Sequence, residues 1–251
     1  MKSSTVQSIT GLGLFLFAGL HIGGHSIAPV SLRGANAALF AVREVVQHPV
    51  TEVVLFAGVT AHLGLGIANM VSRRFRGMSV FRASALILAV TVPLHMVSSR
   101  IIPSFVLTPP QQIDLAHVAH SMNDFKHHPI ISSLLYPYYV VLGSAGLIHG
   151  VLGISQTFRN IKKPHDDAAP AKKNVLLSSS KQMLLTMLKW VEKNKGKFSV
   201  AAVGWMALTM LAINGWAGPI GGDRIYVSRA ASSAMENLHT KTLASLSFNL
   251  L

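Results

Sequence analysis

The sequence predicts an all-α integral membrane protein, in which a four-helix bundle with an internal two-helix repeat is followed by a fifth transmembrane helix. Half of the 251 residues are hydrophobic and only 12% are charged, whereas about a quarter of the residues of soluble proteins are charged. Five apolar segments are long enough to cross a bilayer. A pattern of histidines and prolines also occurs twice along the first four segments.

The five segments each approach the roughly 20 residues that cross about 30 Å of hydrocarbon. They comprise residues 9–27, 50–71, 80–101, 138–158 and 198–217. A single lysine precedes the first segment, and the segment lacks a small-residue cleavage site. We therefore expect a retained span rather than a removed signal peptide.

The basic residues predict the orientation of these spans. Of the 22 Lys and Arg residues, fifteen lie on the amino-terminal side, and the other seven are Arg33, Arg43, Arg100, Lys126, Arg224, Arg229 and Lys241. Positively charged loops stay on the cytoplasmic side, so we expect the amino terminus and residues 159–197 to face the cytoplasm, or the matrix in a mitochondrial inner membrane. We assign the net charge of +13 to contacts with partners and phospholipids, including cardiolipin, and not to nucleic acid.

Residues 159–197 separate the first four spans from the fifth. They contain the polar linker RNIKKPHDDAAPAKKN and then KQMLLTMLKWVEKNK, whose apolar residues recur at helical spacing. Such a basic amphipathic helix lies at a membrane interface or docks on a partner. We therefore divide the chain into a four-helix transmembrane domain (1–158), a basic linker with an interfacial helix (159–197), and a fifth span with a carboxyl-terminal tail (198–251).

The repeat pairs the histidines of the first four spans. HIGGHSIAP, from His21, matches HMVSSRIIP, from His95; HLGLGI, from His62, matches HGVLGI, from His149; and QHPVTEVVL matches HHPIISSLL between them. Each unit contributes two spans, so the units share one orientation and equivalent residues share one depth. We therefore expect His21 opposite His95 and His62 opposite His149. His25 aligns with a serine and has no counterpart.

Paired histidines at equal depth predict haem ligation. Two imidazoles from different helices fill the axial positions of a haem iron within a four-helix bundle, and glycines or serines follow each ligand within one turn. The alternative is that each ring bonds a hydroxyl or carbonyl of a neighbouring helix. The chain has no cysteine, which excludes thiolate metal sites and iron–sulfur clusters.

Weaker candidates surround these ligands. Arg100 and Arg73, with Arg74, are placed to contact haem propionates, although anchoring at the membrane surface also explains them. His48 and His128 precede prolines that we expect to begin helices. His117 and His120 lie three residues apart, and we expect them on a short, solvated surface helix.

Four passages also resemble a known family. LHIGGHSIAP, QHPVTEVVLFAGVTAHLGLGIANMVSRR, LHMVSSRIIP and HHPIISSLLYPYYVVLGSAGLIHGVLGI resemble the transmembrane domain of fungal Mcp-type mitochondrial adaptors, which dock a bulk lipid-transfer protein on the outer membrane. That domain looks like the cytochrome b anchor of succinate dehydrogenases and fumarate reductases, which in its single-chain, two-haem form has five spans, with one ligand histidine in each of the first four. The resemblance covers residues 11–158, leaves out the fifth span and its amphipathic prelude, and implies the same two histidine pairs.

Two functions follow from this resemblance. In the first, the chain is a non-catalytic, haem b-binding anchor subunit of complex II in the mitochondrial inner membrane, where flavoprotein and iron–sulfur subunits pass electrons to ubiquinone. In the alternative, it is an adaptor or scaffold in the outer membrane that recruits a lipid-transfer protein, and its haem is structural or absent. Histidines at two depths favour the first. The anchor's Ser-x-x-His-Arg quinone motif is missing before the first span, so no quinone ligand is assigned.

Overall fold

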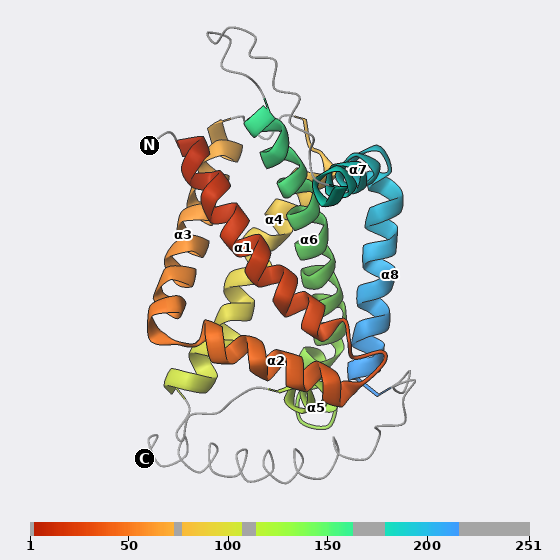
Figure 1. Cartoon of the computed structure of the whole chain (residues 1–251). Helices are drawn as coiled ribbons and strands as arrows, with labels where there is room; N and C mark the ends of the chain where they lie inside the picture. The colour runs from red at the N-terminus through yellow and green to blue at the C-terminus, as the bar shows by residue number, and fades with distance from the viewer. Residues whose placement is uncertain (1–2, 73–76, 107–113, 163–178, 216–251) are drawn as a thin grey trace, which may run out of the picture. The chain divides into compact units, whose positions relative to one another are not determined.

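Helices are the only regular secondary structure in the described part of the chain, and turns or short irregular segments join them. The computed structural model describes residues 3–72, 77–106, 114–162 and 179–215, and no strand occurs among them. Figure 1 shows the helices in chain order. They are α1 (Ser3–His25), α2 (Leu32–Val46), α3 (Pro49–Ser72), α4 (Val80–Met96), the π-helix η1 (Val97–Val106), α5 (Leu115–Asn123), α6 (Pro129–Lys162), α7 (Ser179–Lys193) and α8 (Lys195–Ile213).

The structure confirms five helices that are long and apolar enough to cross a membrane. They are Thr5–His25, Pro49–Ser72, Val80–Ser104, Pro129–Thr157 and Lys195–Ile213. Their outward faces carry large apolar side chains; Leu16 is 61% exposed, Leu20 64% and Val53 68%. A row of such residues along a helix is stable only where lipid covers it. The chain is therefore a multi-pass membrane protein.

The fourth span begins nine residues before the predicted segment 138–158. Pro129 occupies the first position of α6, where its missing N–H costs no hydrogen bond. The carbonyl of His128 accepts from the amide of Ser132 at 2.9 Å. The prediction that His-Pro pairs begin helices is confirmed here, and also at Pro49, where the carbonyl of His48 accepts from the amide of Glu52 at 2.9 Å.

The third span changes its winding after His95. Residues Val97–Val106 form a π-helix that includes Pro103. The hydroxyls of Ser98 and Ser99 donate to the carbonyl of His95 at 3.2 and 2.5 Å. Serine hydroxyls that bond a carbonyl one turn earlier compete with the amide ladder, and Pro103 has no amide proton to contribute. The wider winding therefore follows from the local sequence.

Helix α2 is an element that the sequence analysis missed. Ser31 precedes it, and its Oγ accepts from the amide of Gly34 at 3.0 Å, as an N-cap does. The buried residues Leu32, Ala35 and Leu39 are spaced to share one face of the helix. The helix is amphipathic rather than apolar throughout, so a search for spans does not detect it.

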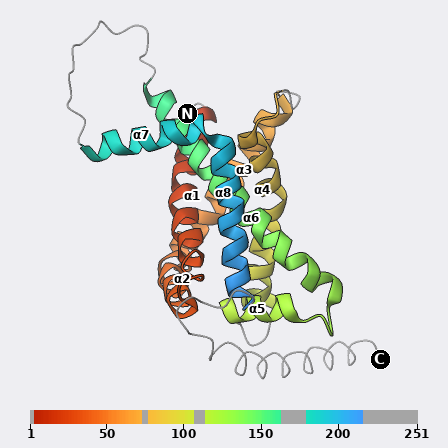
Figure 2. The ribbon, with the colours of Figure 1, turned by 90° about the vertical axis from the view of Figure 1, so that its right-hand side faces the viewer.

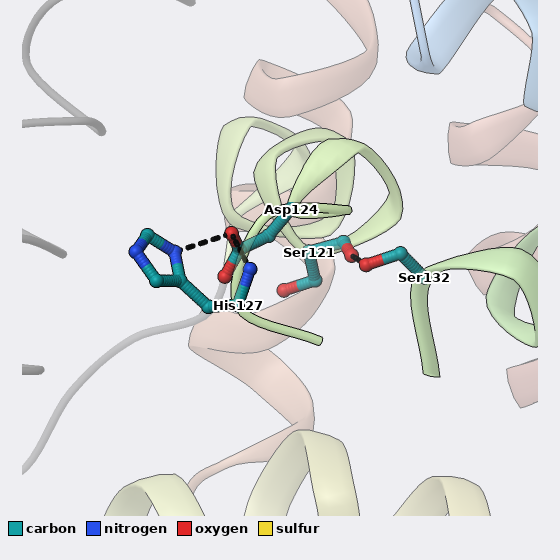
Figure 3. Close-up of polar contacts among 4 residues, drawn as sticks. All are labelled: Ser121, Asp124, His127 and Ser132. Carbon is teal, nitrogen blue, oxygen red and sulfur yellow. Dashed lines mark hydrogen bonds and ion pairs between the residues drawn. The ribbon is translucent and has the colours of Figure 1, made fainter. Parts of the chain in front are cut away.

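A tight turn joins α5 to α6 (Figure 3). Asp124 ends α5 and accepts from Nδ1 of His127 at 2.7 Å. The hydroxyl of Ser132, in the first turn of α6, donates to the carbonyl of Ser121 at 2.9 Å. Ser132 is buried, and this bond satisfies its hydroxyl.

The chain divides into two compact units. Unit 1 comprises 1–23, 42–94 and 141–205, and unit 2 comprises 24–41, 95–140 and 206–251. The core of unit 1 contains Ile148 and Leu152 of α6, Val191 of α7 and Ala202 of α8. In unit 2, the hydroxyl of Tyr136 donates to the carbonyl of Ala207 at 3.1 Å and so ties α6 to α8. The boundaries predicted at residues 158 and 197 stay predictions.

Candidate functional site

Two of the four predicted ligand histidines lie together in unit 1. His62 of α3 and His149 of α6 have ring centroids 6.2 Å apart, with ring planes at 77°. Both side chains are half-buried. The sequence repeat indicates that these two residues face each other, and the structure brings them side by side.

The start of α1 fixes the orientation of His62. Nδ1 of His62 lies 3.2 Å from the carbonyl oxygen of Gln7 and 3.2 Å from Oγ1 of Thr10. A carbonyl oxygen can only accept, so Nδ1 carries the ring proton. The Thr10 hydroxyl donates its own proton to the carbonyl of Val6 at 2.9 Å, and it is therefore also an acceptor toward His62. Nε2 of His62 is left with its lone pair.

Gln7 is itself held by α3. The side-chain amide of Asn69 donates to Oε1 of Gln7 at 2.8 Å, and Asn69 lies two helical turns beyond His62. Gly11 allows this close approach of α1 to α3, because a Cβ at that position would lie 3.0 Å from Cε1 of His62. Three polar contacts and one glycine thus set the position of the His62 ring.

Phe81 of α4 performs the corresponding task for His149. Its ring stacks on the imidazole with centroids 4.5 Å apart and planes within 7°. Its carbonyl oxygen lies 3.5 Å from Nδ1 of His149, which is a long contact. Gly153, one turn after His149, lies against the same phenyl ring; a Cβ there would make an ordinary contact of 3.4 Å with Cε2 of Phe81. This contact again favours a proton on Nδ1 and a lone pair on Nε2.

This arrangement has the donor set of a metal ligand pair. Ligating histidines characteristically donate their second ring N–H to a carbonyl or carboxylate, which fixes the tautomer. A metal–nitrogen bond of about 2 Å on each side, with ~1 Å from each nitrogen to the centre of its ring, separates the centroids of an axial pair by about 6 Å. The observed 6.2 Å, with the ring planes at 77°, is close to that separation and is equally the geometry of an edge-to-face packing contact.

The number of ligands distinguishes haem from an isolated metal ion. Among the residues that the structure describes, no group of three or more His, Cys, Asp or Glu side chains could hold a metal. A structural zinc ion needs four ligands and a catalytic one needs three from the protein, whereas haem brings its own four equatorial nitrogens and needs two axial ones. The residues present therefore fit haem better than zinc.

The second predicted pair is divided between the two units. His21, in unit 1, stacks on Phe17 with ring centroids 5.6 Å apart. His95, in unit 2, makes an edge contact with Tyr139 at 6.0 Å. The pairing of His21 with His95 stays a prediction. His25, which the repeat leaves without a counterpart, is the last residue of α1.

The two arginine candidates have different outcomes. Nη1 of Arg100 donates to Oγ of Ser104 at 2.7 Å, one turn later in η1. Arg73, with Arg74, lies outside the described residues. Contact of either arginine with haem propionates stays a prediction.

The histidines of the short helix α5 are less solvated than predicted. Asp114 caps this helix by accepting from the amide of His117 at 2.8 Å. His117 and His120 are both half-buried. Burial lowers the pKa of His117 from its ordinary value, and the charge of His120 lowers it further, while Asp114 opposes the shift. The short helix is confirmed, but its histidines do not lie on a fully solvated surface.

Sequence reasoning missed the residues that orient the rings of His62 and His149: Gln7, Thr10, Asn69 and Phe81. A signal for the first two was present, because polar side chains inside an apolar span need partners. Their spacing of three residues places them on one face of α1. Phe81 gave no such signal, since a phenylalanine in a membrane helix is ordinary.

Comparison with protein families produced one match. The family model of the transmembrane domain of MDM10-complementing protein 1 matches residues 90–217, just over half of the chain. The match begins within α4 and extends past α8, so it goes beyond the predicted limit of the resemblance at residue 158, and it does not include residues 11–89 of that resemblance. No curated protein and no solved structure matches the chain.

Proposed function

Because the chain belongs to the family of the MDM10-complementing protein 1 transmembrane domain, we propose that it is a mitochondrial membrane adaptor that recruits a lipid-transfer protein. The observation that carries this proposal is the extent of the match, from α4 to the end of α8. It includes the amphipathic helix α7, which lies outside the cytochrome b resemblance. The match therefore favours the adaptor over the complex II anchor.

We assign partner binding to the basic side of the membrane. The described lysines at the junction of α7 and α8 are all exposed: Lys189, Lys193, Lys195 and Lys197. By the distribution of positive charge, this side faces the cytosol if the protein lies in the outer mitochondrial membrane. A lipid-transfer protein that arrives from the cytosol would meet this surface first.

Within this adaptor, we propose that His62 and His149 hold haem b as a structural group. Bound haem would supply an iron centre that accepts the lone pairs of both Nε2 atoms. Gln7 and Thr10 keep the proton of His62 on Nδ1, and the carbonyl of Phe81 favours the same tautomer in His149. The ligand pair would thereby link α3 to α6. We propose His21 and His95 as the ligands of a second haem, with Arg100 and Arg73 near the propionates.

Crosslinking in native mitochondrial membranes tests the adaptor proposal. A lysine-reactive crosslinker is applied to intact mitochondria, and crosslinked peptides are identified by mass spectrometry. We expect repeated links from Lys189 and Lys193 to one lipid-transfer protein. Lys126, an exposed residue between α5 and α6, is the matched control, because it lies on the opposite side of the membrane by the predicted topology.

The partner's identity decides the outcome. Links from the basic side to flavoprotein or iron–sulfur subunits, without a lipid-transfer protein, would reject the adaptor and restore the complex II anchor. Links of the same lipid-transfer protein to Lys126 alone would contradict the assignment of the docking surface to the basic side of the membrane.

A further inference from the structure

Within unit 1, helix α7 packs on α6 and α8 through one narrow face. Leu188 and Val191 are 7% and 8% exposed, and Val191 packs in a core with Ile148 of α6 and Ala202 of α8. Figure 2 shows α7 lying across the start of α8 rather than alongside it. The helix is thus held by the bundle at its carboxyl-terminal end.

A second apolar face of α7 is exposed. Met183, Met187 and Trp190 are 66%, 58% and 56% exposed. Their spacing of four and then three residues places them in a single stripe. This stripe is separate from the buried face, because Leu188 and Val191 lie further around the helix at 100° per residue. An apolar stripe that the bundle does not cover needs another environment.

Lysines border the stripe on its other side. Lys189 and Lys193 are exposed, and helical geometry places both about a quarter-turn or more from the stripe, on the side away from the buried face. Around the helix, the order is therefore buried core, exposed apolar stripe and lysines. This order is typical of a helix that lies in the plane of a membrane surface, with apolar residues in the lipid and lysines at the headgroups.

The start of α8 sets the depth of the stripe. The amide of Asn194 donates to the carbonyl of Trp190 at 2.9 Å, and the amide of Phe198 donates to the carbonyl of Asn194 at 2.9 Å, so α7 runs into α8 with almost no break. Helix α8 is a membrane span from Lys195 onward. Trp190 therefore lies at the level where α8 enters the bilayer, which is the depth that tryptophan prefers.

We propose that α7 is a lipid-binding helix whose stripe of Met183, Met187 and Trp190 inserts into the leaflet on the basic side, and whose lysines bind anionic phospholipid headgroups. The occupant of this face is lipid rather than protein, because the stripe adjoins a span that is already in the bilayer. Attraction between lysines and anionic headgroups strengthens such binding. Headgroup binding places Lys189 and Lys193 at the membrane surface, within reach of a protein that docks on the same side.

The absence of cysteine from the chain makes single-cysteine labelling a clean test. Met183→Cys and Met187→Cys place an environment-sensitive fluorophore on the stripe, and Lys189→Cys and Lys193→Cys are the matched controls on the lysine side. The full chain is reconstituted in vesicles of phosphatidylcholine, either alone or with cardiolipin. Nitroxide-labelled lipids then report which fluorophores lie in the leaflet.

We expect blue-shifted emission and strong quenching by lipid nitroxides at positions 183 and 187, and water-like emission at 189 and 193. Cardiolipin should increase the quenching at the stripe. In the Met187→Cys background, the double substitution Lys189→Gln with Lys193→Gln should reduce this cardiolipin-dependent increase in quenching. Water-like emission at all four positions in both kinds of vesicle would overturn the proposal. Protection of positions 183 and 187 only in native mitochondrial membranes would also overturn it, and would indicate a protein partner.

Discussion

The imidazole of His62 lies 6.2 Å from that of His149, between ring centroids, and the Nδ1 atom of His62 is held by the carbonyl oxygen of Gln7 at 3.2 Å. The first contact joins α3 to α6, and the second joins α1 to α3. Because the second contact requires the proton to be on Nδ1, Nε2 of His62 keeps its lone pair, as the proposed haem ligation requires.

Replacing either histidine of this pair should remove one haem and spare the other. His62→Ala or His149→Ala deletes an axial ligand, and bis-histidine coordination is lost at that level only. His21→Ala or His95→Ala should remove the haem of the other level. Haem content per chain, measured on the purified variants, checks this expectation.

His25→Ala is the control for these substitutions, because the repeat aligns His25 with a serine. Its haem content should stay close to that of the unmodified chain. Equal losses from His21→Ala and His25→Ala would mean that the repeat identifies the wrong histidine of α1.

Thr10→Val should weaken haem retention without abolishing it. The substitution removes one of the two oxygens at Nδ1 of His62 and leaves the Gln7 carbonyl in place. Loss of such an orienting partner lowers metal affinity by about tenfold or more. Haem dissociation into an excess of apomyoglobin measures the effect. Thr60→Val is the matched control. Thr60 lies on the same helix as His62, and its exposed hydroxyl donates to the carbonyl of Phe56. A similar loss of haem from this variant would argue against a specific role for Thr10.

Gly11→Ala should displace the His62 ring. The added Cβ would lie 3.0 Å from Cε1 of His62, and overpacking of this kind typically costs about 1–3 kcal/mol. We expect a lower temperature of unfolding in detergent and a reduced haem content. Gly13→Ala, where nothing lies within 4 Å of the new Cβ, is the control and should leave both measurements unchanged. If the two variants behave alike, the approach of α1 to α3 is looser than described.

Acidification should destabilise the protein partly through His117. Burial lowers the pKa of this histidine below its ordinary value of 6.5, so the unfolded chain takes up a proton first as the pH falls. The stability contributed by the neutral, folded form is thus lost between pH 6.5 and the lower folded-state pKa. His117→Gln should flatten the pH dependence of the unfolding temperature in this window. An unchanged slope for His117→Gln would contradict the assignment.

The five spans could be predicted because the lipid environment imposes a length and an apolar composition on each of them. The start of the fourth span could not, because Ser132 and Tyr136 lower its hydropathy. Their hydroxyls are satisfied by the carbonyls of Ser121 and Ala207, which lie on other helices. Tertiary hydrogen bonds of this kind leave no local signal. Helix α2 was missed for a related reason, since its apolar residues occupy one face only.

The pairing of His62 with His149 could be predicted because the repeat carries positional information that one span alone lacks. The contacts that orient the rings could not be predicted in the same way. His62 bonds a backbone carbonyl of α1, and every residue has such a carbonyl, so the side chain of Gln7 does not indicate it. The sequence thus predicted which two histidines lie together, and the fold identified the contacts that orient them.

The reduced-minus-oxidised visible spectrum of the purified chain, produced with haem available, tests most directly whether His62 and His149 are axial ligands. We predict the sharp bands of low-spin, bis-histidine haem b, with their amplitude reduced in the His149→Ala variant. A correctly folded, colourless preparation of the unmodified chain would contradict the assignment of these histidines.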